Sequence, residues 1–409
     1  MKTALSFLVA ARQGEISELE QLALTSELVG VIARFIHTLQ RERGLSNVFL
    51  ASRGALFGAQ RLAQAAQCDS ACSEMRERFD ALDLQAGRVR NGARLFGRIA
   101  VVLHALEGLP ALRQRVDAQQ LLPAEATALF ARLINGLLAV VFEAADSASD
   151  PGVSRALVAM FNFMQGKEFA GLERAFGGSV FASGRIDAPT RQHWEHLIES
   201  QARCLQVFAD LADPAVVLAW RGNTQAAASL ITLERLRRSA WGQGGDTVDG
   251  SHSTVWYDTC TARIDAMREV EALLATGLRQ LCEARIASAR SELRDEQASL
   301  GLLQQQAAAA SVAAPAGLGP QLERSVLDLV QAQARRLQVL GDELEAARAA
   351  LNERKLVERA KGLLMKSARI DEDAAYQRLR RQAMDRGLPL HELARQVIEA
   401  HRLRDAGLI

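Results

Sequence analysis

Apolar residues recur at helical spacing along most of this chain, and no segment shows a convincing period-two alternation of the kind a β-strand requires. From about residue 18 to 288, long apolar-periodic segments are interrupted by Gly or Pro. The interruptions fall near positions 54, 108–110, 150–152, 177–178, 213–214 and 242–245. Helices of that length bury their apolar stripes against neighbouring helices. The pattern predicts an all-α protein built from long-helix four-helix bundles.

A short internal repeat favours two stacked bundles. The segment 42–52, which begins with Glu42 and Arg43, resembles the segment 173–183, which begins with Glu173 and Arg174. Both segments continue with Val-Phe and with an Ala-Ser pair. A repeated segment of this kind is typical of a duplicated helical unit.

The remainder of the chain divides into two further parts. The Ala-rich segment 307–319 contains Pro315 and predicts a hinge, and apolar residues from Leu322 to Leu351 then predict a long amphipathic helix. We therefore expect a helical bundle over residues 18–300, a hinge with a connecting long helix over 301–350, and a small three-helix module over 351–409. The apolar seam of the long helix leaves two possibilities open, docking on the bundle or pairing with a second chain in a homodimer.

Composition narrows the class of protein. The chain has 49 Lys and Arg and 48 Asp and Glu, but from Leu351 onward 13 basic residues face 9 acidic ones. Five cysteines lack any framework spacing, and we see neither a signal peptide nor a run of about 20 apolar residues. We expect a soluble cytoplasmic protein without a membrane partner. Because no nucleophile, carboxylate pair or metal-ligand cluster is apparent, we expect no enzyme, metal or cofactor.

Two arginines occupy positions on the apolar stripes of their helices. In the helix expected over 27–52, Arg43 continues the stripe that includes Ile36, and in the helix expected over 224–241, Arg237 lies between Leu233 and Trp241. A buried guanidinium requires an anion or an acceptor. One interpretation is a structural ion pair, with Glu42 and Glu234 as neighbours. The other is a site for a small planar oxyanion, held by guanidinium forks in a way that lysine cannot match.

A family resemblance favours the second interpretation. The run Gln40-Arg41-Glu42-Arg43-Gly44-Leu45-Ser46 resembles the hallmark of the NIT domain, a helical sensor of nitrate and nitrite, and residues 233–238 resemble its second arginine-bearing helix. In that family one arginine from each of two helices holds the anion. The resemblance therefore implies Arg43 as one contact, and helical phase favours Arg237 as the other. Alternative candidates for the second position are Arg238 and Arg235. Arg174, in the repeat, either lines a second pocket or pairs with an acidic neighbour such as Glu168 or Glu173.

The C-terminal module shows a basic face with one aromatic residue. Helices are expected over 355–368, after an N-cap at Asp371, and from Pro389 onward. The second helix displays Tyr376 one turn from Arg380, which is a stacking platform with a cation beside it, suited to unpaired loop bases. The alternative is that Tyr376 lies at the edge of the core. Basic residues along the first helix are Lys355, Arg359, Lys361 and Lys366.

The segment 351–403 resembles the ANTAR domain, a three-helix RNA-binding module of transcription antiterminators. The resemblance rests on Ala-Lys-Gly-Leu-Leu-Met at 360–365 and on matching positions that include Ala375 and Tyr376. At Ala383 many family members carry Ser. The family implies binding to leader mRNA hairpins, with Lys361, Tyr376 and Arg380 in contact with RNA.

Together these resemblances imply a nitrate- or nitrite-responsive antitermination regulator. Anion binding in the bundle is expected to release or reorient the C-terminal module, which then binds leader-RNA stem-loops and prevents terminator formation upstream of nitrate assimilation genes. Transcribing RNA polymerase is affected only indirectly. The alternative is a helical sensor-scaffold whose C-terminal module binds a protein. Whether nitrate or nitrite is preferred stays open.

Overall fold

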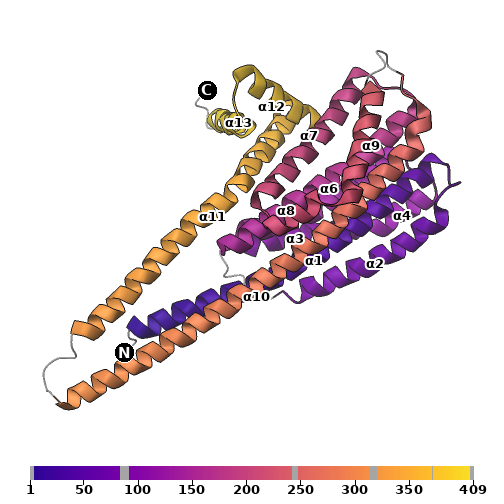
Figure 1. The fold of residues 1–409 in the computed structure, drawn as a ribbon. Helices are drawn as coiled ribbons and strands as arrows, with labels where there is room; N and C mark the ends of the chain where they lie inside the picture. The colour runs from indigo at the N-terminus through magenta and orange to yellow at the C-terminus, as the bar shows by residue number, and fades with distance from the viewer. Residues whose placement is uncertain (1–3, 83–91, 242–246, 314–319, 371, 406–409) are drawn as a thin grey trace.

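The structure is a computed structural model that describes residues 4–82, 92–241, 247–313, 320–370 and 372–405. Within these residues the protein is helical throughout, and the only β-type pairing is a single bridge between Arg185 and Thr247. The prediction of an all-α architecture is confirmed. Two long helices, α10 (Ser253–Ala313) and α11 (Pro320–Ala368), extend away from the body of the molecule toward the end where the N-terminus lies (Figure 1).

The helices of the first half pack around α1, which runs without interruption from Ala4 to Ala51. Its apolar stripe contacts α2 and α5, and α3 covers α5 from outside. The bounds of the others are α2 (Gly58–Asp80), α3 (Gly92–Leu106), α4 (Leu109–Asp117) and α5 (Pro123–Ser147).

The helices of the second half pack around α6 (Pro151–Ser183), which contacts α7 and α10. Buried Trp194 and Trp256 lie edge to face, with ring centroids 5.1 Å apart, and dominate this core. The remaining bounds are α7 (Ala188–Leu211), α8 (Pro214–Arg221), α9 (Thr224–Trp241) and the short 3₁₀-helix η2 (Gly250–His252). Because α1 contacts both α6 and α10, the two halves share one continuous helical body.

Most of the expected helix ends are confirmed. Asp150, Asp187 and Asp213 each precede a proline-containing first turn and accept a backbone N–H from it, which satisfies donors that the helix leaves unpaired. Gly54, with a φ of 83°, follows the end of α1 in the left-handed conformation that favours glycine. The expected break at 242–245 lies outside the described residues.

The expected break at Gly177-Gly178 is wrong. Helix α6 runs straight through both glycines to Ser183. A Cβ atom at Gly177 would overlap the indole ring of Trp256, whereas a Cβ at Gly178 would meet nothing within 4 Å. Gly177 therefore serves close packing of α10 against α6 rather than a turn.

The connection to the C-terminal module also differs from expectation. Residues 307–313 of the expected hinge are helical as the end of α10, and residues 314–319 lie outside the described residues. Helix α11 is continuous across residue 350 and supplies the first helix of the module at its C-terminal end. Helices α12 (Glu372–Arg386) and α13 (Leu390–Asp405) complete the module beside α7 (Figure 1).

By length and composition, three helical stretches reach the hydropathy of membrane-spanning segments: Val9–Ala51, Ala93–Asp117 and Pro123–Ser147. This differs from the expectation that the chain has no such stretch. In the structure 61%, 33% and 50% of these windows are buried by other helices. Helices at the centre of a bundle are apolar on more than one side, which explains part of the resemblance to a membrane span.

Candidate anion site and RNA-binding face

Arg43 is buried at the contact between α1 and α6, as its place on the apolar stripe predicts, with 1% of its surface exposed. Its guanidinium forms a two-pronged ion pair with Glu168 of α6, which is also completely buried. Gln40, one turn earlier on α1, donates from Nε2 to the same carboxylate at 2.8 Å. The Arg43 guanidinium lies over the backbone of Gly171, where an added Cβ would come within 2.5 Å of Nη2. Glycine at this position lets the guanidinium approach α6.

Arg174 makes the reciprocal contact from α6 toward α1. Its Nη2 atom lies where a Cβ at Gly44 would come within 2.5 Å, so the guanidinium rests on the α1 backbone next to Arg43. It donates to Thr261 Oγ1 at 3.0 Å and to the Gln40 carbonyl at 3.4 Å, and lies over the ring of Tyr257. Within the described part of the chain Arg174 has no carboxylate partner. It is a buried cation held only by neutral groups and a π-face.

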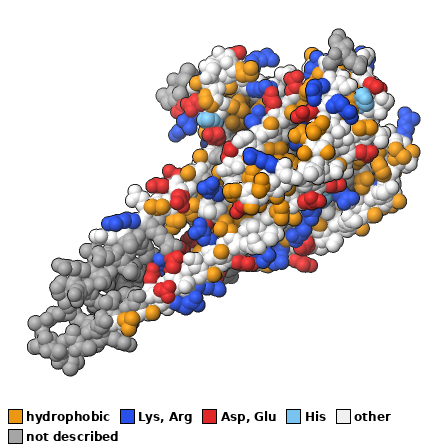
Figure 2. Space-filling view, in the orientation of Figure 1, with side chains coloured by type: hydrophobic (Ala, Val, Ile, Leu, Met, Phe, Trp, Pro, Cys, Tyr) orange, Lys and Arg blue, Asp and Glu red, His pale blue; other side chains and the backbone are white. Residues whose placement is uncertain are grey.

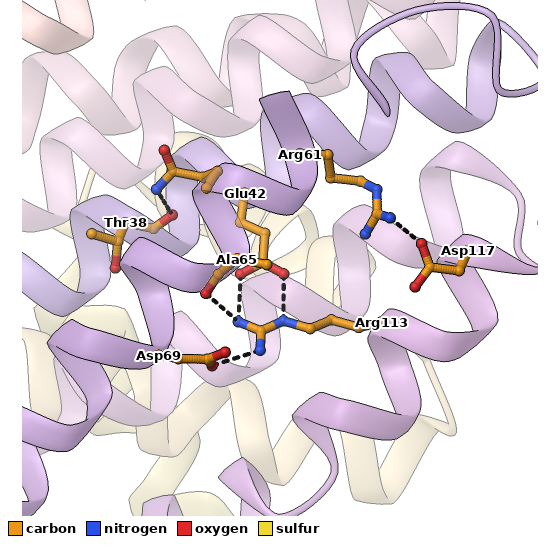
Figure 3. Close-up of polar contacts among 8 residues, drawn as sticks. Thr38, Glu42, Arg61, Ala65, Asp69, Arg113 and Asp117 are labelled. Atoms are coloured by element: carbon orange, nitrogen blue, oxygen red, sulfur yellow. Dashed lines mark hydrogen bonds and ion pairs between the residues drawn. The ribbon is translucent and has the colours of Figure 1, made fainter. Parts of the chain in front are cut away.

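Glu42, the sequence neighbour considered as a partner for Arg43, faces a different helix (Figure 3). Arg113 of α4 donates to both Glu42 oxygens, at 2.7 and 2.9 Å, and also to Asp69 of α2. The interpretation of a structural ion pair is therefore confirmed for Arg43, but its partner is Glu168, and Glu42 as the partner is wrong. Adjacent residues on a helix point about 100° apart, so Glu42 and Arg43 serve separate contacts.

Arg237 of α9 is also buried, and one edge of its guanidinium pairs with Glu173 of α6. Nε and Nη2 donate to the two carboxylate oxygens at 2.8 and 2.6 Å. Trp194 and Gln201 of α7 donate to the same carboxylate. Glu234, the other neighbour considered at sequence level, is exposed. Arg235 and Arg238 are exposed too. Contact of Arg237, Arg238 or Arg235 with an anion stays a prediction.

Cations outnumber carboxylates in this buried region. Lys167 pairs with Glu271, and burial shifts both toward their neutral forms, lowering the pKa of Lys167 and raising that of Glu271. Arg263 is buried beside Glu173, with a pKa lowered by burial, and donates to Gln201. Against the three carboxylates Glu168, Glu173 and Glu271 stand five cations: Arg43, Lys167, Arg174, Arg237 and Arg263. Because buried positive charge is costly without compensating negative charge, this region favours the binding of a further anion.

The C-terminal module forms the expected three-helix core around Ala360, Ala375 and Leu379. Tyr376 is not displayed to solvent, however, since only 7% of it is exposed. Its ring packs against His196 of α7 with centroids 4.3 Å apart, and Arg203 of α7 lies over it at 5.5 Å. Burial raises the pKa of Tyr376. The expectation of an exposed tyrosine is wrong for this state because α12 docks on α7.

The basic residues expected at the RNA face divide into engaged and exposed groups. Arg380 pairs with Glu199 of α7 at 2.7 Å, and Lys355 pairs with Asp146 of α5. Lys361 is largely buried and pairs with Glu358, whereas Arg359 and Lys366 are exposed. Across the visible face of the molecule, basic and acidic side chains are interspersed (Figure 2).

Comparison with known proteins identifies both parts of the chain. Residues 34–279 match the family described as nitrate and nitrite sensing (NIT), and residues 345–398 match the ANTAR domain. A curated relative, the nitrate regulatory protein of Klebsiella oxytoca, is 35% identical over 393 residues, which cover 96% of this chain and 94% of the relative. The chain belongs to this family of NIT–ANTAR regulators.

A solved structure supports the same family assignment. The structure of the NasR transcription antiterminator covers 97% of this chain, and 98% of its own length is matched, at 33% identity and a TM-score of 0.63. This NIT–ANTAR protein is thus a nitrate-responsive antitermination regulator with nitrate as ligand and RNA as target.

Sequence reasoning missed two features of the site. It paired neither Arg43 with Glu168 nor Arg237 with Glu173, because partners 125 and 64 residues away leave no local signal. It noted Arg174 through the repeat and left two alternatives, a second pocket or a pair with Glu168 or Glu173; the structure contradicts the pair. The closely approached glycines Gly44 and Gly171 were a usable signal, since glycine inside a helix is otherwise unfavourable.

Proposed function

We propose that nitrate or nitrite binds at the α1–α6 contact, between the guanidinium groups of Arg43 and Arg174. The observation that carries this is the reciprocal packing of the two side chains on Gly171 and Gly44, together with the absence of a carboxylate on Arg174 within the described residues. A planar oxyanion offers each guanidinium fork two acceptor oxygens. Binding draws Arg43 away from Glu168, or adds the anion beside that pair, and supplies the negative charge that the interior lacks.

Arg237, which helical phase favours, is the second candidate for this position. One edge of its guanidinium, formed by Nε and Nη2, already donates to both Glu173 oxygens, so an anion at that edge has to compete with a bidentate buried ion pair. Arg174 requires no such exchange. We therefore place Arg174 ahead of Arg237.

The signal has a short route to the RNA-binding module. Helix α6 carries Glu168, Gly171 and Arg174, and Glu173 on the same helix accepts hydrogen bonds from Trp194 and Gln201 of α7. Helix α7 in turn holds α12 through its contacts with Tyr376 and Arg380. A shift of α6 against α1 therefore alters the surface on which α12 rests. This route does not pass through the hinge expected between α10 and α11.

In this structure α7 covers the face that includes Tyr376 and Arg380, and we take this docked arrangement as the inactive one. Nitrate favours the state in which α12 leaves α7, and the released module binds leader-RNA stem-loops and so prevents terminator formation upstream of nitrate assimilation genes. A preference of a few kcal/mol for that state is sufficient. The protein acts in the cytoplasm as a regulator without cofactor or turnover, and it affects RNA polymerase only through the transcript. Nitrate or nitrite reduction by the pure protein would contradict this.

Nitrate titration by calorimetry tests the site. Arg43→Lys and Arg174→Lys keep the charge but remove the planar fork, so each is expected to weaken nitrate binding ten- to a hundredfold, equivalent to about 1.5–3 kcal/mol for a charge-assisted hydrogen bond. Arg41→Lys is the matched control, because Arg41 is exposed on α1 two residues from Arg43. Unchanged affinity in Arg174→Lys, with a loss in Arg237→Lys, moves the second contact to Arg237.

Leader-RNA binding with and without nitrate tests the output. Nitrate is expected to raise the affinity of the intact protein, and Tyr376→Ala is expected to abolish specific binding in both conditions because the stacking surface is lost. Met384→Ala is the control, since Met384 lies on the same helix and is 71% exposed. Unaltered RNA binding in Tyr376→Ala, with a protein captured instead by the nitrate-bound module, favours the scaffold alternative.

A further inference from the structure

A cleft of about 1410 Å³ lies between the sensor bundle and the C-terminal module. One wall comes from α11 and α12, and includes Lys355, Arg359, Lys361 and Tyr376, which are residues expected at the RNA face. The cleft therefore continues the RNA-binding face of the module onto the sensor domain.

The opposite wall carries basic residues of the sensor bundle. Arg94 and Arg98 lie one turn apart on α3, and Arg132 lies on the neighbouring helix α5. The side chains of Arg94 and Arg98 are 66% and 54% exposed. Their closest carboxylates, the largely buried Asp146 and Glu143, lie 3.8 and 3.6 Å away, beyond hydrogen-bond distance. Arg132 is exposed and has no ion pair among the described residues.

The sequence around α3 shows the same bias. Between Asp83 and Glu107 the chain contains four arginines and not one carboxylate. Local excess of arginine on one face is the electrostatic footprint of a phosphate-rich partner.

We propose that Arg94, Arg98 and Arg132 of the sensor domain form a second RNA contact, which holds the phosphate backbone across the cleft from α11. Arginine binds phosphate through two parallel hydrogen bonds, and such contacts position an RNA without reading its sequence. The cleft wall contains seven Arg and Lys but only two Glu, so its charge suits a polyanion. The sensor domain thereby contributes to affinity, and the module reads the loop bases.

RNA is favoured over an acidic protein because the cleft is shared with the RNA-binding module itself. This inference rests on the proposed RNA-binding role of the module. It goes beyond that role in assigning RNA contact to the domain that senses nitrate. The contact needs no exposed Tyr376, so it operates in the ligand-free protein as well and keeps transcripts close before nitrate releases the specific face.

The test uses the full-length protein and an RNA hairpin with a scrambled loop, without nitrate, over 50 to 300 mM salt. The triple variant Arg94→Ala, Arg98→Ala and Arg132→Ala is compared with a matched triple in which three exposed arginines outside the cleft, Arg76, Arg115 and Arg221, are replaced by Ala. Loss of three phosphate contacts is expected to reduce the slope of log affinity against log salt by about 2 to 3, and to weaken binding up to roughly a hundredfold at 0.1 M salt. The matched triple is expected to stay within about twofold, since it removes the same charge elsewhere.

Two results overturn the proposal: an unchanged salt slope in the cleft variant, or an equal loss in both triples, which indicates net charge alone. A third result would also overturn it. If polyglutamate displaces the RNA hairpin at an equal concentration of negative charge, the cleft binds acidic proteins instead. Circular dichroism verifies that each variant is folded. Nitrate-dependent binding of the leader hairpin is measured on the same variants. If it persists while the cleft contact fails, the proposed function stands without this inference.

Discussion

The α1–α6 contact and the α7–α12 contact both join arginines to glutamates, yet they differ in burial. Arg43 and Glu168 at the first contact are 1% and 0% exposed, whereas Arg380 and Glu199 at the second are 30% and 38% exposed. Removing one member of a buried pair leaves a charge that water does not reach, and the cost is several kcal/mol. A half-exposed pair is screened by solvent and contributes under about 1 kcal/mol.

This difference assigns separate roles to the two regions. A small anion gains most where charges are buried, and the buried region around α6, which includes the α1–α6 contact, also has more cations than carboxylates. Among the described residues, the α7–α12 contact includes a tilted ring contact, a cation over a ring, one ion pair and a hydrogen bond from Gln192 to Gln377, so a modest change suffices to separate it. Strong binding at the input and weak docking at the output are what a ligand-driven release requires.

The largest effect is expected for Arg237→Ala, which breaks a second buried ion pair, between α9 and α6, that matches the burial of the α1–α6 contact. The variant leaves the Glu173 carboxylate buried without its cation, which lowers the free energy of unfolding by about 3–5 kcal/mol. Denaturant unfolding followed by circular dichroism measures this. The control Arg238→Ala removes an exposed neighbour and is expected to change stability by less than about 0.5 kcal/mol. A loss below 1 kcal/mol in Arg237→Ala contradicts the assignment of a buried structural pair.

The next largest effect on stability is expected at Gly177, where α6 packs against α10. Gly177→Ala places a Cβ against the Trp256 ring and is expected to lower the free energy of unfolding by about 1–3 kcal/mol. Gly178→Ala meets no atom within 4 Å, and it is expected to be neutral or to stabilise the helix by up to about 1 kcal/mol. Thermal unfolding of the two variants compares adjacent glycines in one helix. Equal effects contradict a packing role for Gly177.

His37 makes the buried region sensitive to pH. Burial, with Lys167, Arg268, Arg41 and Arg174 nearby, lowers the pKa of His37 from 6.5 to about 2. The unfolded chain therefore binds a proton below pH 6.5 that the folded chain does not. Stability from this group is fully present above pH 6.5 and falls by about 1.4 kcal/mol per pH unit below it.

Urea unfolding at pH 7.5 and 5.5 measures this effect as the difference between wild type and His37→Gln, which does not titrate. The wild type is expected to lose about 1.4 kcal/mol more than the variant on acidification. An equal loss in both proteins shows that His37 is protonated in the folded state.

The smallest effect is expected at the docking contact. Glu199→Ala removes the partner of Arg380 and weakens docking by under about 1 kcal/mol. RNA affinity without nitrate is then expected to rise two- to fivefold, with no change with nitrate. Glu195→Ala, an exposed residue on the same helix, is the control. A lower RNA affinity in Glu199→Ala means that α7 does not mask the module.

Local signals predicted much of the fold. The helical class, the proline-initiated helices with Asp caps and the module core around Ala360 and Leu379 all follow from residues close together in the chain. Gly177 shows the limit of such signals. Glycine marks either a turn or a close approach, and only the position of Trp256 distinguishes the two.

By itself, the sequence determined that this protein is helical, that Arg43 and Arg237 are buried, and which residues form the core of the C-terminal module. Helical periodicity settles these features because they depend only on the face of one helix. The tertiary structure alone decided that Glu168 and Glu173 are the partner carboxylates, that Arg174 lies beside Arg43 without one, and that α7 covers Tyr376. These features depend on which helices meet, and packing between distant segments leaves no periodic trace along the chain.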